Sequence, residues 1–223
     1  MNNSLSSLIA RGNANEYTLK SLLRNYGFKV PNSVLISQAG ISVDIRYPVA
    51  LKVVDSRILH KTEMGAIKLG IRDQADLARE IALMKGKFQK SDLMVEEMQT
   101  DGLETIAGLY RDSTFGLCIM IGMGGIFSEL YGDVTFRGVP INRVDAIEMV
   151  GETRISKFAG DGFRGLKANT DSLVSFLLRL SDFAADNEDC IQQLDLNPVL
   201  VKEHEEVILD AKIIGYSANK GLL

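Results

Sequence analysis

The 223-residue sequence lacks the features that mark several special classes of protein. No apolar run approaches the roughly 18 residues that a membrane-spanning helix needs, so we expect no transmembrane segment. The N-terminus has no basic stretch followed by a long apolar core, so we expect no secretory signal and a cytoplasmic location. The chain also lacks internal repeats and low-complexity linkers, which leaves an ordinary globular protein as the expectation.

Cysteine is scarce as well, and the chain has no excess of positive charge. The only cysteines, Cys118 and Cys190, lie in apolar segments, which is typical of buried, reduced thiols and not of a disulfide framework. The net charge of −4, without basic residues interleaved with aromatic ones, argues against binding to nucleic acid. The composition, 46% hydrophobic and 24% charged, is sufficient for a real core in one large domain or two small ones.

Hydrophobic periodicity predicts a mixture of helices and strands, and therefore an α/β (α+β) fold class. Capping residues indicate where several helices begin, because Asp and Asn side chains accept hydrogen bonds from the first free backbone N–H groups. Helices are expected over 16–26, from Asp73 to about residue 90, over 143–150 after Asn142, and after Asn169. Strands are expected over 33–37, 49–54, 66–71, 93–98, 104–111, 115–122 and 126–130.

The segment 191–213 predicts a hairpin, in which two strands are joined by the charged turn 202–206. Folding the chain at this turn brings Asp195 and Asn197 near Asp210. These side chains carry oxygen atoms on short stems, which are the ligands that Mg²⁺ prefers. The pattern alone equally fits a surface hairpin with ordinary turn residues, because Asp and Asn are common near turns.

Two features of the first half of the chain suggest that it contacts an anionic group. Lys52 is a cation inside the otherwise apolar strand 49–54, and burying it without a partner would cost several kcal/mol, so it should either reach solvent or meet an anion. The loop 55–65 contains His60, whose imidazole is available as a neutral nucleophile near pH 7. The alternative for His60 is a loop histidine bonded to a carboxylate such as Glu63.

A glycine-rich turn, Gly-Met-Gly-Gly at 122–125, fits either a tight hairpin or a phosphate cradle. It is not a P-loop, because no Lys-Ser/Thr pair follows at the required spacing. It is not a dinucleotide fingerprint either, because Phe127 stands where the third glycine would be needed.

A series of short motifs runs in order across nearly the whole chain: YPVALK at 47–52, ILHKTEMG at 58–65, VEEM at 95–98 with Glu104 after it, GMGGIF at 122–127, the segment 133–140, FRG at 163–165, LDLNP at 194–198 and LDAKI at 209–213. With these motifs the chain resembles the ATP-grasp β subunit of ADP-forming (NDP-forming) acyl-CoA synthetases, of which acetyl-CoA synthetase is the type member, and more distantly the ATP-grasp half of the succinyl-CoA synthetase β subunit. Ala66 departs from this family's pattern, which usually has a second glycine there, as does Gln193, where glutamate is usual; the segment before Tyr47 is also shorter than usual.

The resemblance implies an ATP-grasp fold, in which two α/β subdomains, 1–98 and 99–223, clasp ATP between them. It implies an ADP-forming acid–thiol ligase, in which acid, CoA and ATP exchange reversibly with acyl-CoA, ADP and phosphate, and phosphate passes through histidine. The metal ligands for Mg²⁺ would be Asn197, Asp210 and Asp195, and the phosphate-accepting or phosphate-relaying residue would be His60. The residues that would contact ATP are Lys52, Lys61, Glu96, Glu97, Met98, Glu104, Gly124 and Gly125.

The resemblance also implies a CoA-binding α subunit as partner, in an αβ or α2β2 hetero-oligomer, through which the small carboxylic acid and CoA are supplied. Arg137 and Arg164 would then either dock the partner's phosphohistidine segment or lie solvated on the surface. Two other functions remain open: a stand-alone ATP-grasp carboxylate ligase that acts through an acyl phosphate, and a non-catalytic nucleotide-binding subunit.

Overall fold

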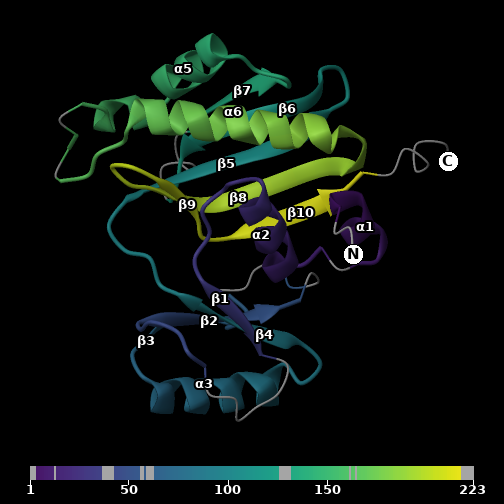
Figure 1. Ribbon diagram of the computed structural model, residues 1–223, viewed down its shortest axis with the longest axis vertical. Helices are drawn as coiled ribbons and strands as arrows, with labels where there is room; N and C mark the ends of the chain where they lie inside the picture. Colours follow the sequence, from purple (N-terminus) through teal and green to yellow (C-terminus); the bar gives the residue numbers. More distant parts are fainter. Residues whose placement is uncertain are drawn as a thin grey trace. The chain divides into compact units, whose positions relative to one another are not determined.

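The computed structural model describes residues 4–12, 14–36, 43–55, 58, 63–125, 132–160, 162–163 and 165–216. The chain forms two compact units, each with its own sheet (Figure 1). The larger unit comprises Met1–Ala14, Thr18–Val30 and Asp101–Leu223, and the smaller unit comprises Asn15–Tyr17 and Pro31–Thr100. The subdomain limits expected from the sequence, 1–98 and 99–223, remain a proposal.

The larger unit is built on an antiparallel sheet with the strand order β10-β8-β5-β6-β7, and β9 pairs with β8. Its strands are β5 Leu103–Asp112, β6 Gly116–Met123, β7 Val134–Gly138, β8 Ile191–Val201, β9 Glu206–Ile208 and β10 Ala211–Gly215. The helices α5 and α6 lie along one side of this sheet in Figure 1. The helices counted with this unit, wholly or in large part, are α1 Leu5–Ala10, α2 Glu16–Asn25, α5 Arg143–Glu152 and α6 Thr170–Asp186, with 3₁₀ turns at Arg154–Phe158 and Glu188–Cys190.

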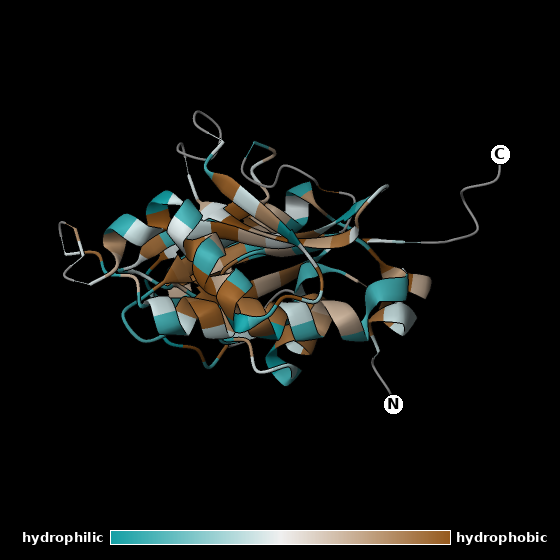
Figure 2. Ribbon diagram, turned by 90° about the horizontal axis from the view of Figure 1, so that it is seen from above, coloured by the Kyte–Doolittle hydropathy of each residue, from teal (hydrophilic) through white to brown (hydrophobic). Residues whose placement is uncertain are grey.

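The core of the larger unit is a continuous apolar cluster between the sheet and its helices. Helix α6 contributes seven buried apolar residues to it, which recur at the spacing of one helix face. The sheet contributes the alternate residues of β5, β6 and β8 that point to the same side, such as Leu109, Ile119 and Leu194. Figure 2 shows the result as hydrophobic stretches that alternate with hydrophilic ones around the helical ribbons.

The smaller unit is a four-stranded antiparallel sheet with the order β1-β4-β2-β3 and one long helix. Its strands are β1 Ser33–Ile36, β2 Val49–Val54, β3 Ile67–Ile71 and β4 Asp92–Glu97, and its helix is α3 Gln74–Lys87. Asp73 caps α3 by accepting a hydrogen bond from the N–H of Asp76 at 2.9 Å. A second apolar cluster, separate from that of the larger unit, includes Leu51, Leu77 and Val95.

Most of the expected elements are confirmed, and some were missed. The C-terminal hairpin forms as β8 and β9, with Lys202 donating its N–H to the carbonyl of Glu205 across the turn at 2.8 Å. Helix α1 and strand β7 were not expected, because each is only five or six residues long and carries too few turns or alternations to be recognised. Strand β6 continues through Met123, so the glycine-rich turn begins later than expected. The strand expected over 126–130 lies outside the described residues.

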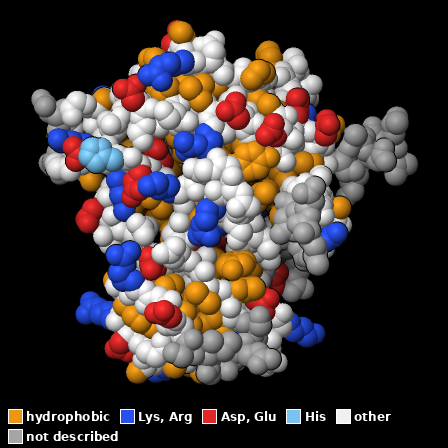
Figure 3. Space-filling model, in the orientation of Figure 1, with side chains coloured by type: hydrophobic (Ala, Val, Ile, Leu, Met, Phe, Trp, Pro, Cys, Tyr) orange, Lys and Arg blue, Asp and Glu red, His pale blue; other side chains and the backbone are white. Residues whose placement is uncertain are grey.

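The surface carries charges of both signs. On the face drawn in Figure 3, the described Lys and Arg side chains are interspersed with Asp and Glu and do not gather into one basic area. Among the described residues, no helix is both long enough and apolar enough to cross a membrane.

Candidate functional site

The predicted metal-binding residues come together in the larger unit, where Asp195 and Asn197 lie on β8 and Asp210 lies just before β10. Asn197 donates its backbone N–H to the carbonyl oxygen of Asp210 at 3.2 Å, so these two residues are direct neighbours. Asp195 lies two residues before Asn197 on β8 and pairs in register with Lys212 of β10. The hairpin predicted from the sequence therefore does place Asp195, Asn197 and Asp210 side by side.

The electrostatics of this site suit a cation. Burial raises the pKa of the Asp195 carboxyl above its usual value, and the nearby carboxylate of Asp210 raises the pKa further, while Lys212 opposes the shift. Two carboxylates that disfavour each other's charge are stabilised when a cation binds both. Among the described residues no three His, Cys, Asp or Glu side chains form a metal-binding group. A hard cation here would thus also need the amide oxygen of Asn197 and oxygens from a ligand, which is how proteins hold Mg²⁺ beside phosphates.

Glu104, Gly124 and Gly125 form a second group in the larger unit. The N–H of Gly124 donates to the carbonyl oxygen of Glu104 at 2.9 Å, and a Cβ atom at position 124 would lie 2.9 Å from the same backbone. Gly125 has a φ of +64°, and a Cβ atom there would lie 3.7 Å from the Glu104 carboxylate. The Gly124 N–H is already bonded within the protein, so it is not a donor for a ligand. The turn instead leaves space and lets a ligand approach the backbone closely.

Lys52 is buried in the smaller unit between two carboxylates. It is 5% exposed, and its Nζ atom lies 3.0 Å from Oε1 of Glu16 and 2.8 Å from Oε1 of Glu96. Of the two outcomes expected for this cation, solvent contact is therefore wrong and pairing with an anion is confirmed, although the anions seen are protein carboxylates. Lys52 and Glu96 had been predicted to bind the same nucleotide, and they are in direct contact here.

The backbone of Glu97 and Met98, expected to contact the adenine base, is engaged in the smaller unit's own hydrogen bonds. The N–H of Glu97 donates to the carbonyl of Asn32 at 2.9 Å, and the N–H of Met98 donates to the carbonyl of Pro48 at 3.0 Å. The Met98 sulfur also accepts from the N–H of Gly70 at 3.0 Å. A base that accepts from the Met98 N–H would have to displace the Pro48 carbonyl.

Three of the predicted residues, His60, Lys61 and Arg164, lie outside the described residues. Two of the departures from the family pattern, Ala66 and Gln193, lie within them. Ala66 is fully buried, and its carbonyl accepts from the N–H of Val53 at 2.8 Å, which ties the start of β3 to β2. Gln193 pairs in register with Ile214 on β10.

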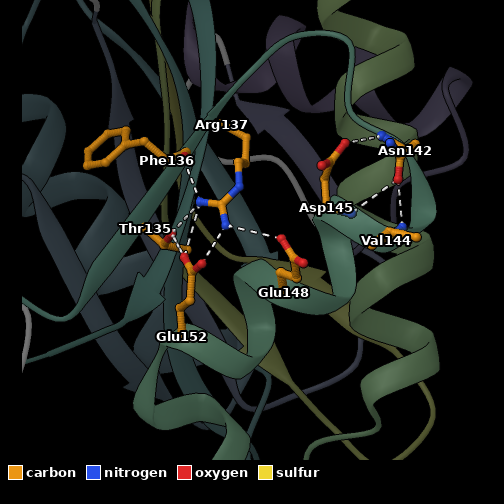
Figure 4. A network of polar contacts seen from close by, with 8 residues as sticks. All are labelled: Thr135, Phe136, Arg137, Asn142, Val144, Asp145, Glu148 and Glu152. Atoms are coloured by element: carbon orange, nitrogen blue, oxygen red, sulfur yellow. Dashed lines mark hydrogen bonds and ion pairs between the residues drawn. The ribbon is translucent and has the colours of Figure 1, made fainter.

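Arg137 lies on β7 within a network that joins this strand to α5 (Figure 4). Its guanidinium donates to Oγ1 of Thr135 at 3.2 Å and forms an ion pair with Glu152, and Glu148 lies 3.7 Å away. The hydrogen bonds that Arg137 donates to the Glu152 carboxylate raise the pKa of Arg137 and lower the pKa of Glu152. A partner segment that docks on Arg137 would therefore have to compete with carboxylates of α5.

The sequence reasoning missed two buried charged residues of helix α2. Glu16 contacts Lys52, as described above, and Lys20 is 1% exposed and donates from Nζ to the carbonyl oxygen of Leu209, next to Asp210, at 2.5 Å. A signal was present in the sequence: positions 16, 19, 20 and 23 recur at helical spacing, so Glu16 and Lys20 share the stripe of Leu19 and Leu23. Charged residues in an apolar stripe are candidates for buried pairs.

Comparisons with known proteins identify the family of the chain. The ATP-grasp domain family matches residues 9–214. The β subunit of ADP-forming acetate–CoA ligase II from Pyrococcus furiosus is 35% identical over 213 residues, covering 89% of this chain and 90% of that protein. ADP-forming acetate–CoA ligase II from Archaeoglobus fulgidus is 32% identical over 204 residues, and there the match spans only 30% of the relative's length.

A solved structure shows the same fold. The dinucleotide-forming acetyl-coenzyme A synthetase 1 of Ca. Korarchaeum cryptofilum aligns with a TM-score of 0.81 and 30% identity, covering 95% of this chain and 98% of that one. That structure contains coenzyme A and Mg-AMPPCP, with the phosphohistidine segment pointing towards the nucleotide-binding site. The chain described here belongs to the ATP-grasp family, and its relatives of matching length are β subunits of ADP-forming acetate–CoA ligases.

Proposed function

We propose that this chain is the ATP-binding subunit of an ADP-forming acyl-CoA synthetase of the acetyl-CoA type. It transfers a phosphoryl group between ATP or ADP and a histidine, within the reaction in which acid, CoA and ATP exchange with acyl-CoA, ADP and phosphate. The observation that carries the proposal is the group of oxygen donors formed by Asp195 and Asn197 on β8 and by Asp210 just before β10, in a chain whose structural neighbour holds Mg-AMPPCP.

In the larger unit, Asn197 and Asp210 bind Mg²⁺, with Asp195 as a shared ligand or as a carboxylate that supports the other two. A bound Mg²⁺ neutralises charge on the phosphate oxygens of the nucleotide. Asp195 suits this role because burial and the neighbouring carboxylate of Asp210 raise its pKa, and a bound cation would favour its charged form. The exposed carboxylate of Glu104 accepts hydrogen bonds from the ribose hydroxyls, and the turn at Gly124 and Gly125 leaves room for the phosphates.

In the smaller unit, the Lys52 ammonium contacts an α- or β-phosphate oxygen, and Lys61 adds a second cation. The segment from Glu96 to Met98 binds the adenine base. His60 accepts or relays the phosphoryl group: a bond forms between its ring nitrogen and phosphorus, while the bond from phosphorus to the bridging oxygen of ATP breaks and ADP leaves. Because transfer of a phosphoryl group depends mainly on positioning and on neutralising charge, these few residues suffice.

The CoA-binding part of the enzyme is supplied by a partner α subunit in a cytoplasmic αβ or α2β2 assembly. Support comes from the lengths of the relatives. The chain matches 90% of a protein named as a β subunit and 30% of a longer protein named as the ligase itself. The carboxylic acid and CoA therefore bind on the partner, and the chain alone does not complete the reaction.

The test mixes the chain with its CoA-binding partner and follows ADP release. We expect release to require both the acid and CoA, and to be abolished by His60→Ala. His204→Ala is the matched control, since this second histidine is exposed in the turn between β8 and β9, and it should leave the rate unchanged.

Full activity of the His60→Ala variant would remove His60 from the mechanism. ATP turnover by the chain alone, with a small acid and an amine, would instead identify a stand-alone ligase. Mg-ATP binding without phosphoryl transfer to any partner would identify a non-catalytic nucleotide-binding subunit.

A further inference from the structure

Lys52 carries one positive charge and is paired with two carboxylates. All six residues of β2 are buried, and the Lys52 side chain is 6% exposed. The side chains of Glu16 and Glu96 are each 4% exposed, and both bond to the same Nζ atom. One ammonium is therefore held by two carboxylates that are as deeply buried as the lysine itself.

The two carboxylates come from different parts of the smaller unit. Glu96 is on β4, where it pairs in register with Ala50, two residues before Lys52 on β2, so it extends from the same face of the sheet as Lys52. Glu16 is the first residue of α2 and lies 36 residues before Lys52 in the sequence. The neighbouring strand thus already supplies one partner, and Glu16 is a second partner that the sheet alone does not require.

Charge alone would make Glu16 unfavourable for binding a nucleotide. Two carboxylates beside one lysine place negative charge near the position where a phosphate group would bind, and like charges repel. The geometry of the contacts, in contrast, favours a supporting role for Glu16. A lysine side chain is long and flexible, and its ammonium has three N–H donors that point in different directions. Two fixed acceptors on separate elements restrict both where the ammonium lies and how it is turned.

We propose that Glu16 is a positioning residue for nucleotide binding: together with Glu96 it holds the Lys52 ammonium in place to bind an anionic phosphate group. This inference rests on the proposed function, in which Lys52 contacts the nucleotide. Glu16 acts only through Lys52 and does not itself contact the nucleotide.

The experiment is a double-mutant cycle on the full chain, in which the dissociation constant for Mg-ATP is measured by calorimetry. We expect Glu16→Gln to weaken binding by about tenfold, the scale of one lost hydrogen bond to a charged group. Lys52→Met should weaken binding at least as much. In the Lys52→Met background, Glu16→Gln should add nothing, because a residue that acts through Lys52 has no further effect once Lys52 is gone.

The matched control is Glu80→Gln. Glu80 pairs with Lys68 at 3.4 Å in the same unit, and the Lys68 side chain is 51% exposed, so the same chemical change is made at a surface pair. This variant should bind Mg-ATP as the unmodified chain does. Glu16→Asp keeps the carboxylate but shortens the side chain, and it should bind more tightly than Glu16→Gln. Thermal unfolding of every variant separates a loss of fold from a loss of binding, and should Glu16→Gln fail to fold, Glu16→Asp takes its place in the cycle.

The outcomes separate this inference from the function on which it rests. If the unmodified chain does not bind Mg-ATP, the proposed function fails, and the inference fails with it. If the unmodified chain binds Mg-ATP but Glu16→Gln binds equally well or more tightly, only the inference is overturned. It is also overturned if the effects of Glu16→Gln and Lys52→Met are additive, since Glu16 would then act independently of Lys52.

Discussion

At the scale of single residues, the protein buries several charged side chains in its interior. Lys20 and Lys52 are 1% and 5% exposed, and each donates to an oxygen within 3.0 Å. Burying a charge is costly unless it is paired and hydrogen-bonded, so these partners are a condition of the fold. Among the described residues, Oε1 of Glu206 is the one buried side-chain nitrogen or oxygen atom without a hydrogen-bond partner.

Glu206 should therefore lower the stability of the protein at neutral pH. Burial raises the pKa of its carboxyl, and the neighbouring Glu205 raises it further, whereas the Ser172 hydroxyl, its own backbone N–H and the Arg179 guanidinium lower it less strongly. A raised pKa means that the folded state holds the proton more tightly than the unfolded state. The free energy of unfolding therefore falls as the pH rises from the unfolded-state pKa, about 4.3, through the folded-state pKa.

We predict that Glu206→Gln raises the free energy of unfolding at pH 7, because the neutral amide removes the cost of a buried charge. The gain should disappear below about pH 4, where glutamate is protonated in both states. Denaturant unfolding at a series of pH values measures it. Glu205→Gln is the matched control of opposite sign: the Lys29 hydrogen bond lowers the pKa of Glu205, so this variant should lose stability at pH 7 and not at low pH. A pH-independent effect of Glu206→Gln would contradict the prediction.

At the scale of elements, caps and close strand contacts decide where helices and strands lie. Asn142 begins α5 with a reciprocal cap, accepting from the N–H groups of Val144 at 2.7 Å and Asp145 at 3.2 Å while Asp145 accepts from the Asn142 N–H (Figure 4). The ion pair of Arg137 with Glu152 then ties the C-terminal end of α5 to β7. Local hydrogen bonds of this kind were visible in the sequence as caps, whereas the Arg137 contact was not.

Gly108 lies on β5 where this strand pairs with β8, the strand that carries Asp195 and Asn197. A Cβ atom there would lie 2.3 Å from the backbone carbonyl oxygen of Leu194, a distance that real Cβ atoms do not reach. Gly108 also pairs in register with Asp195. Glycine is therefore needed at this position so that the central strands can pair beside the site.

We predict that Gly108→Ala lowers the free energy of unfolding by about 1–3 kcal/mol, since the added methyl group forces the strands apart. It should also weaken Mg²⁺-dependent nucleotide binding, because Asp195 is displaced with β8. Gly138→Ala is the matched control on β7, where a Cβ atom would have nothing within 4 Å. Chemical denaturation and calorimetry measure the two effects, and equal stability of both variants would show that the β5–β8 contact relaxes without cost.

At the scale of the whole molecule, the chain has two units with separate apolar clusters, and the proposed nucleotide contacts are distributed over both. Lys52 and Glu96 belong to the smaller unit, whereas Glu104, Asn197 and Asp210 belong to the larger one. A ligand that binds only the folded protein raises its stability in proportion to the logarithm of ligand concentration. Stability in the presence of nucleotide is therefore a direct test of the proposed site.

We predict that Mg-ATP at 100 times its dissociation constant raises the free energy of unfolding by about 2.7 kcal/mol. ATP with EDTA should stabilise the protein much less, because without a cation the carboxylates of Asp195 and Asp210 repel the triphosphate. Asp210→Asn should remove the difference between the two conditions. Thermal unfolding at constant protein concentration provides the measurement, and equal stabilisation with and without Mg²⁺ would exclude a metal at this position.

The sequence by itself determined the parts that depend on near neighbours. The periodicity of 16–26 predicted α2, Asp73, Asn142 and Asn169 predicted helix starts, and the polar turn at 202–206 predicted the hairpin that joins Asp195 and Asn197 to Asp210. These predictions succeeded because helix caps, turns and strand alternation are decided by residues within a few positions of one another.

Only the tertiary structure decided which buried charges meet. The partners of Lys52 lie 36 and 44 residues away in the sequence, and the partner of Lys20 lies 189 residues away. No local pattern encodes such pairs, because they form only after separate elements have packed and excluded water. The same holds for Gly108, whose need for glycine comes from a carbonyl on another strand. Local signals thus specified the elements and the family, while packing over long sequence distances placed the charges that make the site.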